Sequence, residues 1–218
     1  MREYVISKIE QEKIIAIVRG VEKKKLIPIA QALYDGGIRL IEVTYSMDKK
    51  ISDEQTAEMI ASLARHFQGE MLVGAGTVIE EKQVEYTKQA GGSFIISPDT
   101  YAPVIQRTRD LGMVSIPGAI TPTEALTAVR AGADFVKLFP IAKMGGPSYV
   151  KAIFAPLSGV KMLAVGGIDE NNIADYIKVG VKGFGIGANI IDKKLVEAED
   201  YAGITALAKR YMAKCAGC

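Results

Sequence analysis

The sequence predicts one parallel (β/α)₈ barrel, or TIM barrel, with an extra N-terminal helix, comprising residues 1–218 as a single domain. Eight short, apolar, β-branched segments alternate with helical patterns along the chain. These segments are too uniformly apolar to be half-exposed, which is typical of parallel strands covered by helices. Glycine closes most of the helical patterns, where it takes the left-handed conformation that ends a helix. Eight strands close such a barrel, and 218 residues lie near the low end of its usual range of about 200 to over 400.

The expected strands lie at 14–18, 40–45, 71–78, 94–97, 114–117, 135–139, 162–166 and 183–186. The helical patterns between them lie at 24–34, 53–67, 80–89, 101–110, 123–130, 148–155 and 171–178. Apolar positions in these patterns follow three-and-four spacing, as at Ile173, Tyr176 and Ile177. We expect residues 1–13 to form a helix that caps the N-terminal end of the barrel, and residues 195–213 to form the last helix. An open doubly wound sheet is the alternative, but it would more often have about five to seven strands and a dinucleotide fingerprint.

The composition is that of a globular protein with a substantial core. Hydrophobic residues make up 49% of the chain and charged residues 24%, an ordinary balance. The net charge of +2 is too small to indicate nucleic acid. No run approaches the roughly 18 apolar residues of a membrane span, and the N-terminus lacks the apolar core of a signal peptide. We therefore expect a cytoplasmic protein whose partner is a small molecule, with no nucleic acid and no membrane.

The two cysteines, Cys215 and Cys218, form a C-x-x-C pair at the C-terminus. Such a pair can be redox-active or bind zinc, but a zinc site of this kind needs two further ligands. The single histidine, His66, lies far away in an expected helix. We therefore expect a disordered tail at the C-terminus, and neither a histidine-based metal site nor a Ser-His-Asp triad.

Two charged residues stand inside strand-like apolar segments: Lys137 within Phe135–Pro140, and Glu42 within Leu40–Tyr45. A lysine buried without a partner lowers its pKa, which frees an amine nucleophile near neutral pH. A lysine and a carboxylate so placed indicate a Schiff-base lysine served by an acid/base group. They fall on the second and sixth expected strands, and alternate strands supply one interior layer of such a barrel. A buried ion pair that only holds the core together is the alternative, although such pairs are weak stabilisers for their desolvation cost.

Further candidates follow the strand ends, where the active sites of such barrels lie. Arg19 ends the first strand and suits a substrate carboxylate or phosphate, although a rim salt bridge explains it nearly as well. Gly76 and Thr77 follow the third strand. Small residues there let a ligand approach the backbone, and Thr77 offers a hydroxyl group, although a tight turn explains the glycine about as well.

Glycine-rich loops end the last two expected strands, with helix N-termini behind them. Gly166 and Gly167 follow the seventh strand and Gly187 the eighth, as in the phosphate site common in such barrels. Tight turns are the alternative explanation of these glycines. The ends of the fourth, fifth and sixth strands carry residues that would shape the pocket, namely Pro98, Pro117 and Phe139.

As a set, these segments resemble the KDPG/KHG aldolases, which are class I enzymes. They cleave 2-keto-3-deoxy-6-phosphogluconate (KDPG) or 4-hydroxy-2-oxoglutarate (KHG). The matching segments are Ile-Val-Arg-Gly, Ile-Glu-Val-Thr, Gly-Ala-Gly-Thr, Ile-Ser-Pro, Ile-Pro-Gly, Val-Lys-Leu-Phe-Pro and Val-Gly-Gly. They run from about Ile14 to Asn189 in the family's order and with nearly its spacing.

The resemblance implies that Lys137 is the Schiff-base lysine and Glu42 the general acid/base. It also implies that Thr77 holds the pyruvate carboxylate and that Arg19 matches an arginine of many members. The phosphate-side loops would be those of Gly166, Gly167 and Gly187. The resemblance further implies a homotrimer, no metal and no organic cofactor.

Several positions depart from the family pattern. Ser46 stands where some members carry an arginine that contacts the pyruvate moiety, so Arg19 would take more of the carboxylate binding. Val165 replaces a threonine of gluconate-specific members and resembles the branch that acts on the galactonate-derived epimer. Ala188 replaces a serine often found in the last phosphate loop, which would weaken the grip on phosphate. The loop 47–55 is longer than usual.

The sequence therefore predicts a lyase that cleaves a 2-keto-3-deoxy-6-phospho sugar acid, or KHG as a second candidate substrate, into pyruvate and an aldehyde. The aldehyde would be glyceraldehyde 3-phosphate or glyoxylate. One alternative is a phosphosugar isomerase or epimerase on the same barrel, which would keep the phosphate loops but need no buried lysine. The other is a non-catalytic protein that binds a phosphometabolite without turnover.

Overall fold

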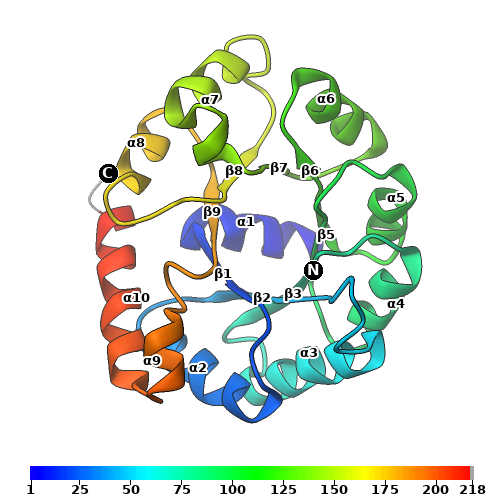
Figure 1. Ribbon diagram of the computed structural model, residues 1–218. Coiled ribbons are helices and arrows are strands. Elements are labelled where there is room, and N and C mark those ends of the chain that lie inside the picture. Colours follow the sequence, from blue (N-terminus) through cyan, green and yellow to red (C-terminus); the bar gives the residue numbers. More distant parts are fainter. Residues whose placement is uncertain (217–218) are drawn as a thin grey trace.

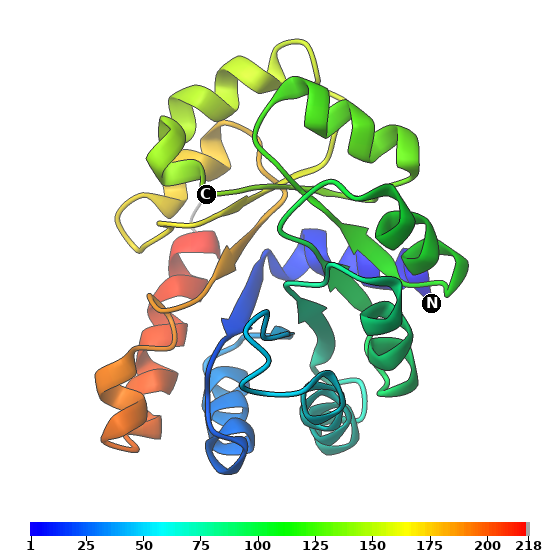
Figure 2. The same cartoon turned by 45° about the vertical axis from the view of Figure 1, so that its right-hand side comes forward.

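The computed structural model describes residues 1–216 and arranges them as parallel strands inside a ring of helices (Figure 1). The strands form one sheet in the order β5-β4-β3-β2-β1-β9-β8-β7-β6. Figure 2 shows the helices on the outer side of these strands. The predicted (β/α)₈ barrel class is confirmed.

The strands are β1 (Ile14–Val18), β2 (Leu40–Thr44), β3 (Leu72–Gly76), β4 (Phe94–Ile96), β5 (Val114–Ile116), β6 (Gly118–Ala119), β7 (Val136–Leu138), β8 (Met162–Val165) and β9 (Gly183–Ile186). The helices are α1 (Arg2–Glu12), α2 (Lys23–Asp35), α3 (Asp53–Phe67), α4 (Glu81–Gln89), α5 (Ala102–Asp110), α6 (Pro122–Ala131), α7 (Gly146–Phe154), α8 (Ile173–Lys178), α9 (Lys193–Glu197) and α10 (Tyr201–Ala216), with a 3₁₀ turn at Ile141–Met144. The predicted elements agree with these bounds to within two residues at each end, apart from the fifth strand and the last helix.

The fifth predicted strand is two strands in the structure, which corrects the count of eight. Pro117 separates β5 from β6 and has no N–H group to donate to a strand ladder. β5 pairs with β4, whereas β6 pairs with β7. The Pro117 carbonyl accepts a hydrogen bond of 2.8 Å from the backbone N–H of Lys137. This short segment therefore contacts both neighbours and brings the two ends of the sheet together.

The last predicted helix, at residues 195–213, is also wrong, because α9 and α10 are separate helices. Between them Glu199 adopts a left-handed φ of 54°, which ends the first helix. The carboxylate of Asp200 then accepts a hydrogen bond of 2.8 Å from the backbone N–H of Gly203. Apolar spacing continues on both sides of the break, so periodicity alone does not reveal it.

Helix α1 closes the N-terminal end of the barrel, as the sequence predicted. Val5, Ile6 and Ile9 belong to the apolar cluster that fills the barrel interior. Figure 1 shows this helix within the ring of strands. Arg2 forms an ion pair with the buried carboxylate of Asp134, just before β7. The N-terminal end of the barrel interior is therefore filled by apolar side chains of α1.

Side chains along each strand alternate between the barrel interior and the layer beneath the helices. On β2, Ile41 and Val43 belong to the outer apolar layer, which places Glu42 on the interior face. On β7, Val136 and Leu138 belong to that same outer layer. Lys137 therefore faces the interior as well.

No helix within residues 1–216 is long and apolar enough to cross a lipid bilayer. In the same part of the chain, no group of three or more His, Cys, Asp or Glu side chains is placed to hold a metal ion. Cys215 is buried on α10, which extends to Ala216, so the expectation of a disordered tail is wrong for this part of the chain. Cys218, the other member of the C-x-x-C pair, lies outside the described residues.

Candidate active site

Strand β7 carries Lys137 into the interior near the strand's C-terminal end. The residue is only 8% exposed. Its Nζ donates a hydrogen bond of 3.2 Å to the carbonyl oxygen of Ser97, after β4, and lies 4.9 Å from the ring centroid of Phe139. Burial lowers the pKa of this amine, and the negative charge of Glu42 only partly opposes the effect. At neutral pH a larger fraction of a buried lysine than of an exposed lysine is in the neutral, nucleophilic form.

Strand β2 presents Glu42 to the same interior space. The residue is 2% exposed, and its Oε2 atom is buried without a hydrogen-bond partner among the described residues. Burial raises the pKa of this carboxyl to about 7, against the opposing charges of Lys137 and Arg19. A carboxyl group with such a pKa can both accept and donate protons at neutral pH.

Glu42 and Lys137 influence each other's pKa. Within the described part of the chain, however, no direct ion pair joins them. Lys137 instead bonds to the Ser97 carbonyl. The structure therefore does not contain the core-stabilising ion pair that was the alternative explanation of these two residues.

Gly76, at the end of β3, leaves the space that the Glu42 side chain fills. A Cβ at this position would lie 1.5 Å from Glu42 Oε1. Gly74, two residues earlier, is equally constrained, since its Cβ would lie 2.3 Å from the ring of Phe94. The sequence suggested that Gly76 admits a ligand or forms a tight turn. In the structure, Gly76 makes room for the buried carboxylate and Gly74 for a core aromatic ring.

Arg19 and Thr77 meet across the rim of the barrel, at the ends of β1 and β3. Arg19 Nη2 donates a hydrogen bond of 3.3 Å to Thr77 Oγ1. Thr77 has a left-handed φ of 56°, which is unusual for a β-branched residue and is found at sites that constrain the backbone. In the described residues, Arg19 forms no ion pair with a carboxylate. Its guanidinium group and the threonine hydroxyl together suit a ligand carboxylate.

A cavity of about 680 Å³ lies at the C-terminal ends of β7, β8, β9 and β1. Its lining includes Phe139, whose ring faces Lys137 Nζ. It also includes Arg19, which bonds to Thr77. The cavity therefore reaches Lys137 through the Phe139 ring, whereas Lys137, Glu42 and Thr77 themselves do not line it. The three glycines of the predicted phosphate loops line it too: Gly166, Gly167 and Gly187.

The two glycine loops form one wall of this cavity. Gly166 and Gly167 have φ values of 91° and 81°, which other residues rarely adopt. A Cβ on Gly167 would also lie 2.5 Å from the Cβ of Ala142. Asn189 Nδ2 donates a hydrogen bond of 2.7 Å to the Ile168 carbonyl and ties the loop after β9 to the loop after β8. Their exposed backbone can approach a phosphate closely.

Pro98 and Pro117 do not line this cavity and lie on the part of the rim that follows β4 and β5. Gly118, next to Pro117, packs so closely on Pro98 that a Cβ would lie 2.2 Å from the Pro98 carbonyl oxygen. Thr100 Oγ1 donates a hydrogen bond of 2.7 Å to the Gly118 carbonyl. These contacts hold the loop after β4, and with it the Ser97 carbonyl that binds Lys137. The sequence did not indicate this acceptor, because a backbone carbonyl leaves no residue-type signal.

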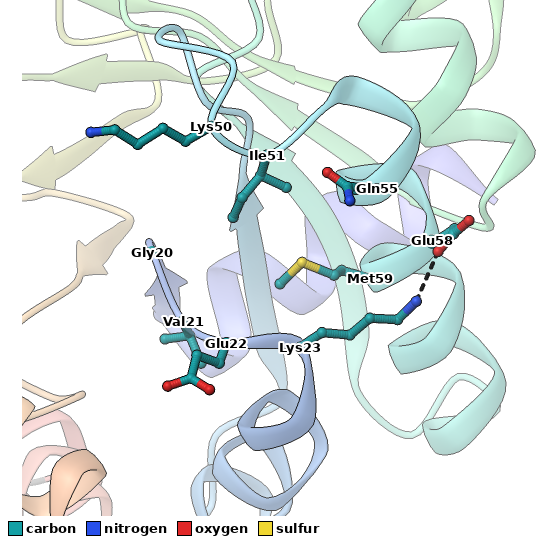
Figure 3. Close-up of a pocket in the computed structure, with 9 residues that line it drawn as sticks. All are labelled: Gly20, Val21, Glu22, Lys23, Lys50, Ile51, Gln55, Glu58 and Met59. Atoms are coloured by element: carbon teal, nitrogen blue, oxygen red, sulfur yellow. Dashed lines mark hydrogen bonds and ion pairs between the residues drawn. The ribbon is translucent and has the colours of Figure 1, made fainter.

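A second cavity of about 400 Å³ lies farther out, between the starts of α2 and α3 (Figure 3). It shares Gly20, Val21 and Glu22 with the larger one. Lys23 forms an ion pair of 2.8 Å with Glu58 across its edge. In Figure 3, the Lys50 side chain extends the opposite way from that of Lys23. The charged groups that line this smaller cavity do not point toward one common position. We therefore assign the candidate active site to the larger cavity.

The family model for KDPG and KHG aldolase matches residues 5–207 of this chain. This chain belongs to the KDPG and KHG aldolase family. It is thus an aldolase, an enzyme of the aldehyde-lyase class.

Relatives of this aldolase carry names for both sugar-acid epimers. The probable 2-dehydro-3-deoxy-6-phosphogalactonate aldolase of Rhizobium meliloti is 38% identical over 83% of this chain and 82% of its own length. The 2-dehydro-3-deoxy-6-phosphogalactonate aldolase of Escherichia coli K12 is 34% identical over 81% of this chain and 83% of its own. A solved KDPG aldolase of Legionella pneumophila is 27% identical, with a TM-score of 0.83 over 94% of this chain and 96% of that chain. That structure contains pyruvate captured at low pH as a covalent carbinolamine intermediate.

Proposed function

We propose that this aldolase cleaves a 2-keto-3-deoxy-6-phospho sugar acid by a class I mechanism in which Lys137 forms the Schiff base. The observation that carries the proposal is the environment of Lys137. The amine is 8% exposed, its pKa is lowered by burial, and it lies beside a cavity large enough for a small ligand. Pyruvate captured as a carbinolamine in the Legionella enzyme supports the same chemistry.

The proposed reaction begins when the neutral Lys137 amine attacks the C2 ketone of the substrate. The carbinolamine that forms loses water and becomes a protonated imine, which acts as an electron sink. Deprotonation of the C4 hydroxyl then breaks the C3–C4 bond, whose electron pair moves into an enamine while the aldehyde leaves. Protonation of the enamine at C3 and addition of water to the imine release pyruvate and restore the amine.

Glu42 supplies the proton transfers in this proposal, directly or through one water molecule. A pKa of about 7 is suited to a group that both donates and accepts protons at neutral pH. Its buried Oε2 atom has no partner among the described residues and is therefore available to substrate or water. Proton donation is needed for dehydration of the carbinolamine, and proton acceptance for cleavage at C4.

The remaining residues bind the two ends of the substrate. Arg19 and Thr77, linked at 3.3 Å, would hold the pyruvate carboxylate, since a guanidinium and a hydroxyl group both donate to it. The phosphate would lie against the glycine loops of Gly166, Gly167 and Gly187, which line the cavity.

For the substrate we propose 2-dehydro-3-deoxy-6-phosphogalactonate rather than its gluconate epimer. Val165 lines the cavity, where members specific for the gluconate-derived substrate often carry a threonine. Valine has the same shape as threonine but cannot hydrogen-bond to a substrate hydroxyl group. The two relatives named for the galactonate-derived compound support this choice. Comparing kcat/KM for both epimers, with and without the phosphate, tests it directly.

Borohydride reduction in the presence of pyruvate tests the mechanism. We expect irreversible inactivation and a covalent adduct on the peptide that contains Lys137. Treatment without pyruvate is the control and should leave the enzyme active. An adduct absent from that peptide would remove the Schiff-base role. Cleavage of the sugar acid that survives in Lys137→Ala would likewise contradict the Schiff-base role of this lysine.

The family resemblance also implies a homotrimer, which we retain as part of the proposal. Light scattering of the purified protein tests it, because the mass in solution would be that of three chains. A mass of one chain would contradict this assembly without affecting the proposed chemistry.

A further inference from the structure

The outer end of the large cavity lies between α2 and α9, beyond the glycine loops. The cavity lining carries three cationic side chains, Arg19, Lys25 and Lys193, and two carboxylates, Glu22 and Glu197. Arg19 lies at the Lys137 end, so the two lysines are the cations of the outer end. A net positive lining favours an anionic ligand group.

Lys25 forms contacts that join two helices. Its side chain is 15% exposed, and its Nζ donates a hydrogen bond of 3.1 Å to the Val196 carbonyl. It also pairs with Glu199 at 3.3 Å. These contacts join α2 to the end of α9. Lys25 therefore holds α9 in place and has little freedom to reach into the cavity.

Lys193, the first residue of α9, is free to move by comparison. Its side chain is 84% exposed, and its ion pair with Glu197 is long, at 3.5 Å. Such exposed pairs four residues apart on a helix are weak. The other acidic lining residue, Glu22, pairs with Lys24 at 3.1 Å. A dianionic ligand group would therefore compete easily with Glu197 for the Lys193 ammonium group.

We infer that Lys193 binds the terminal phosphate of the substrate and that Lys25 positions the helix that presents it. This inference rests on the proposed function and names a residue of this chain for the substrate's far end. Ala188 also lines this cavity and offers no hydroxyl group to a phosphate. An ammonium group on the neighbouring α9 supplies a charged donor in its place.

The test compares Lys193→Gln with Lys194→Gln. Lys194 is the next residue on α9, is also exposed, and does not line the cavity, so the two variants lose the same charge from the same short helix. The first measurement is calorimetric binding of inorganic phosphate, which needs no turnover. The second is the ratio of kcat/KM for the phosphorylated over the unphosphorylated sugar acid.

For Lys193→Gln we expect roughly 10-fold weaker phosphate binding and a roughly 10-fold lower ratio, as for the loss of one charge-assisted hydrogen bond. For Lys194→Gln we expect wild-type values in both measurements. Equal effects in the two variants, no effect in either, or no binding of phosphate by the wild type would overturn the inference.

Failure of the proposed function would look different. The pyruvate adduct on Lys137 would then be absent from the wild type, while phosphate binding would still weaken in Lys193→Gln. Conversely, an adduct on Lys137 together with unchanged phosphate selectivity in Lys193→Gln would reject the Lys193 assignment and leave the aldolase mechanism intact.

Discussion

The carboxylate of Glu42 occupies the space that any side chain at Gly76 would need. A Cβ at residue 76 would lie 1.5 Å from Glu42 Oε1 and 2.2 Å from its carboxyl carbon. The two residues lie on neighbouring strands, where Gly76 pairs with Thr44, two residues beyond Glu42. The position of the proposed acid/base group therefore depends on the absence of a side chain on the next strand.

Replacement of Gly76 by Ala should displace this carboxylate. We expect kcat to fall by a factor of roughly 100, in line with the usual contribution of one acid/base group. Overpacking should also lower the free energy of unfolding by about 1–3 kcal/mol. Gly159 offers a matched control, because a Cβ there would meet no atom within 4 Å. Equal kinetics for Gly76→Ala and Gly159→Ala would contradict the prediction.

Replacement of Glu42 by Gln should separate proton transfer from imine formation. We expect kcat for cleavage to fall roughly 100- to 10,000-fold, because an amide cannot exchange a proton. Borohydride trapping of pyruvate on Lys137 should decline less, since trapping needs the nucleophile and dehydration of the carbinolamine but not the proton acceptance at C4. Mass spectrometry of the trapped peptide and steady-state kinetics give the two readouts. Unchanged turnover would remove Glu42 from the mechanism.

The stability of the protein should depend on pH through Glu42. Its pKa is raised from 4.5 to about 7 by burial, so the folded protein binds more protons than the unfolded chain between these values. The free energy of unfolding therefore falls as pH rises from 4.5 to 7, by about 3 kcal/mol from this group. Urea titrations of wild type and Glu42→Gln check this. The stability of the variant relative to wild type should rise across the window, and a constant difference would refute it.

Replacement of Arg19 by Gln should weaken recognition of the substrate carboxylate. We expect roughly 10- to 100-fold higher concentrations of pyruvate for half-maximal trapping on Lys137, because a charge-assisted contact is lost. Methyl pyruvate is the control ligand, since its ester group carries no negative charge. If the concentration for half-maximal trapping rises equally for pyruvate and methyl pyruvate, then Arg19 affects Lys137 or the fold and does not bind the carboxylate.

Replacement of Val165 by Thr should change the preference between epimers. A hydroxyl group on this cavity wall would donate to the substrate, and we expect kcat/KM for KDPG relative to its galactonate epimer to rise roughly 10-fold. Ala188→Ser adds a hydroxyl group to the same cavity near the phosphate loops. It should therefore affect both epimers alike. An unaltered epimer ratio in Val165→Thr would mean that other residues discriminate at C4.

Much of the fold was predictable because it depends on local patterns. Uniformly apolar segments between amphipathic helices specify parallel strands covered on the outside, and their number specifies the barrel. The exceptions have local causes that periodicity does not register. Pro117 divides one strand because it lacks an N–H group, and the left-handed turn at Glu199 divides the last helix within a continuous apolar pattern.

By itself the sequence determined which residues are chemically unusual. A lysine or glutamate within a buried apolar strand cannot reach water, and its charged form therefore carries a desolvation cost. That was enough to expect Lys137 and Glu42 inside the barrel. Only the tertiary structure decided what surrounds them. The Ser97 carbonyl at 3.2 Å from Lys137, the space above Gly76 and Lys193 at the outer end of the cavity all come from other elements. Such contacts join residues far apart in the chain, and they exist only once strand register and barrel closure bring those elements together.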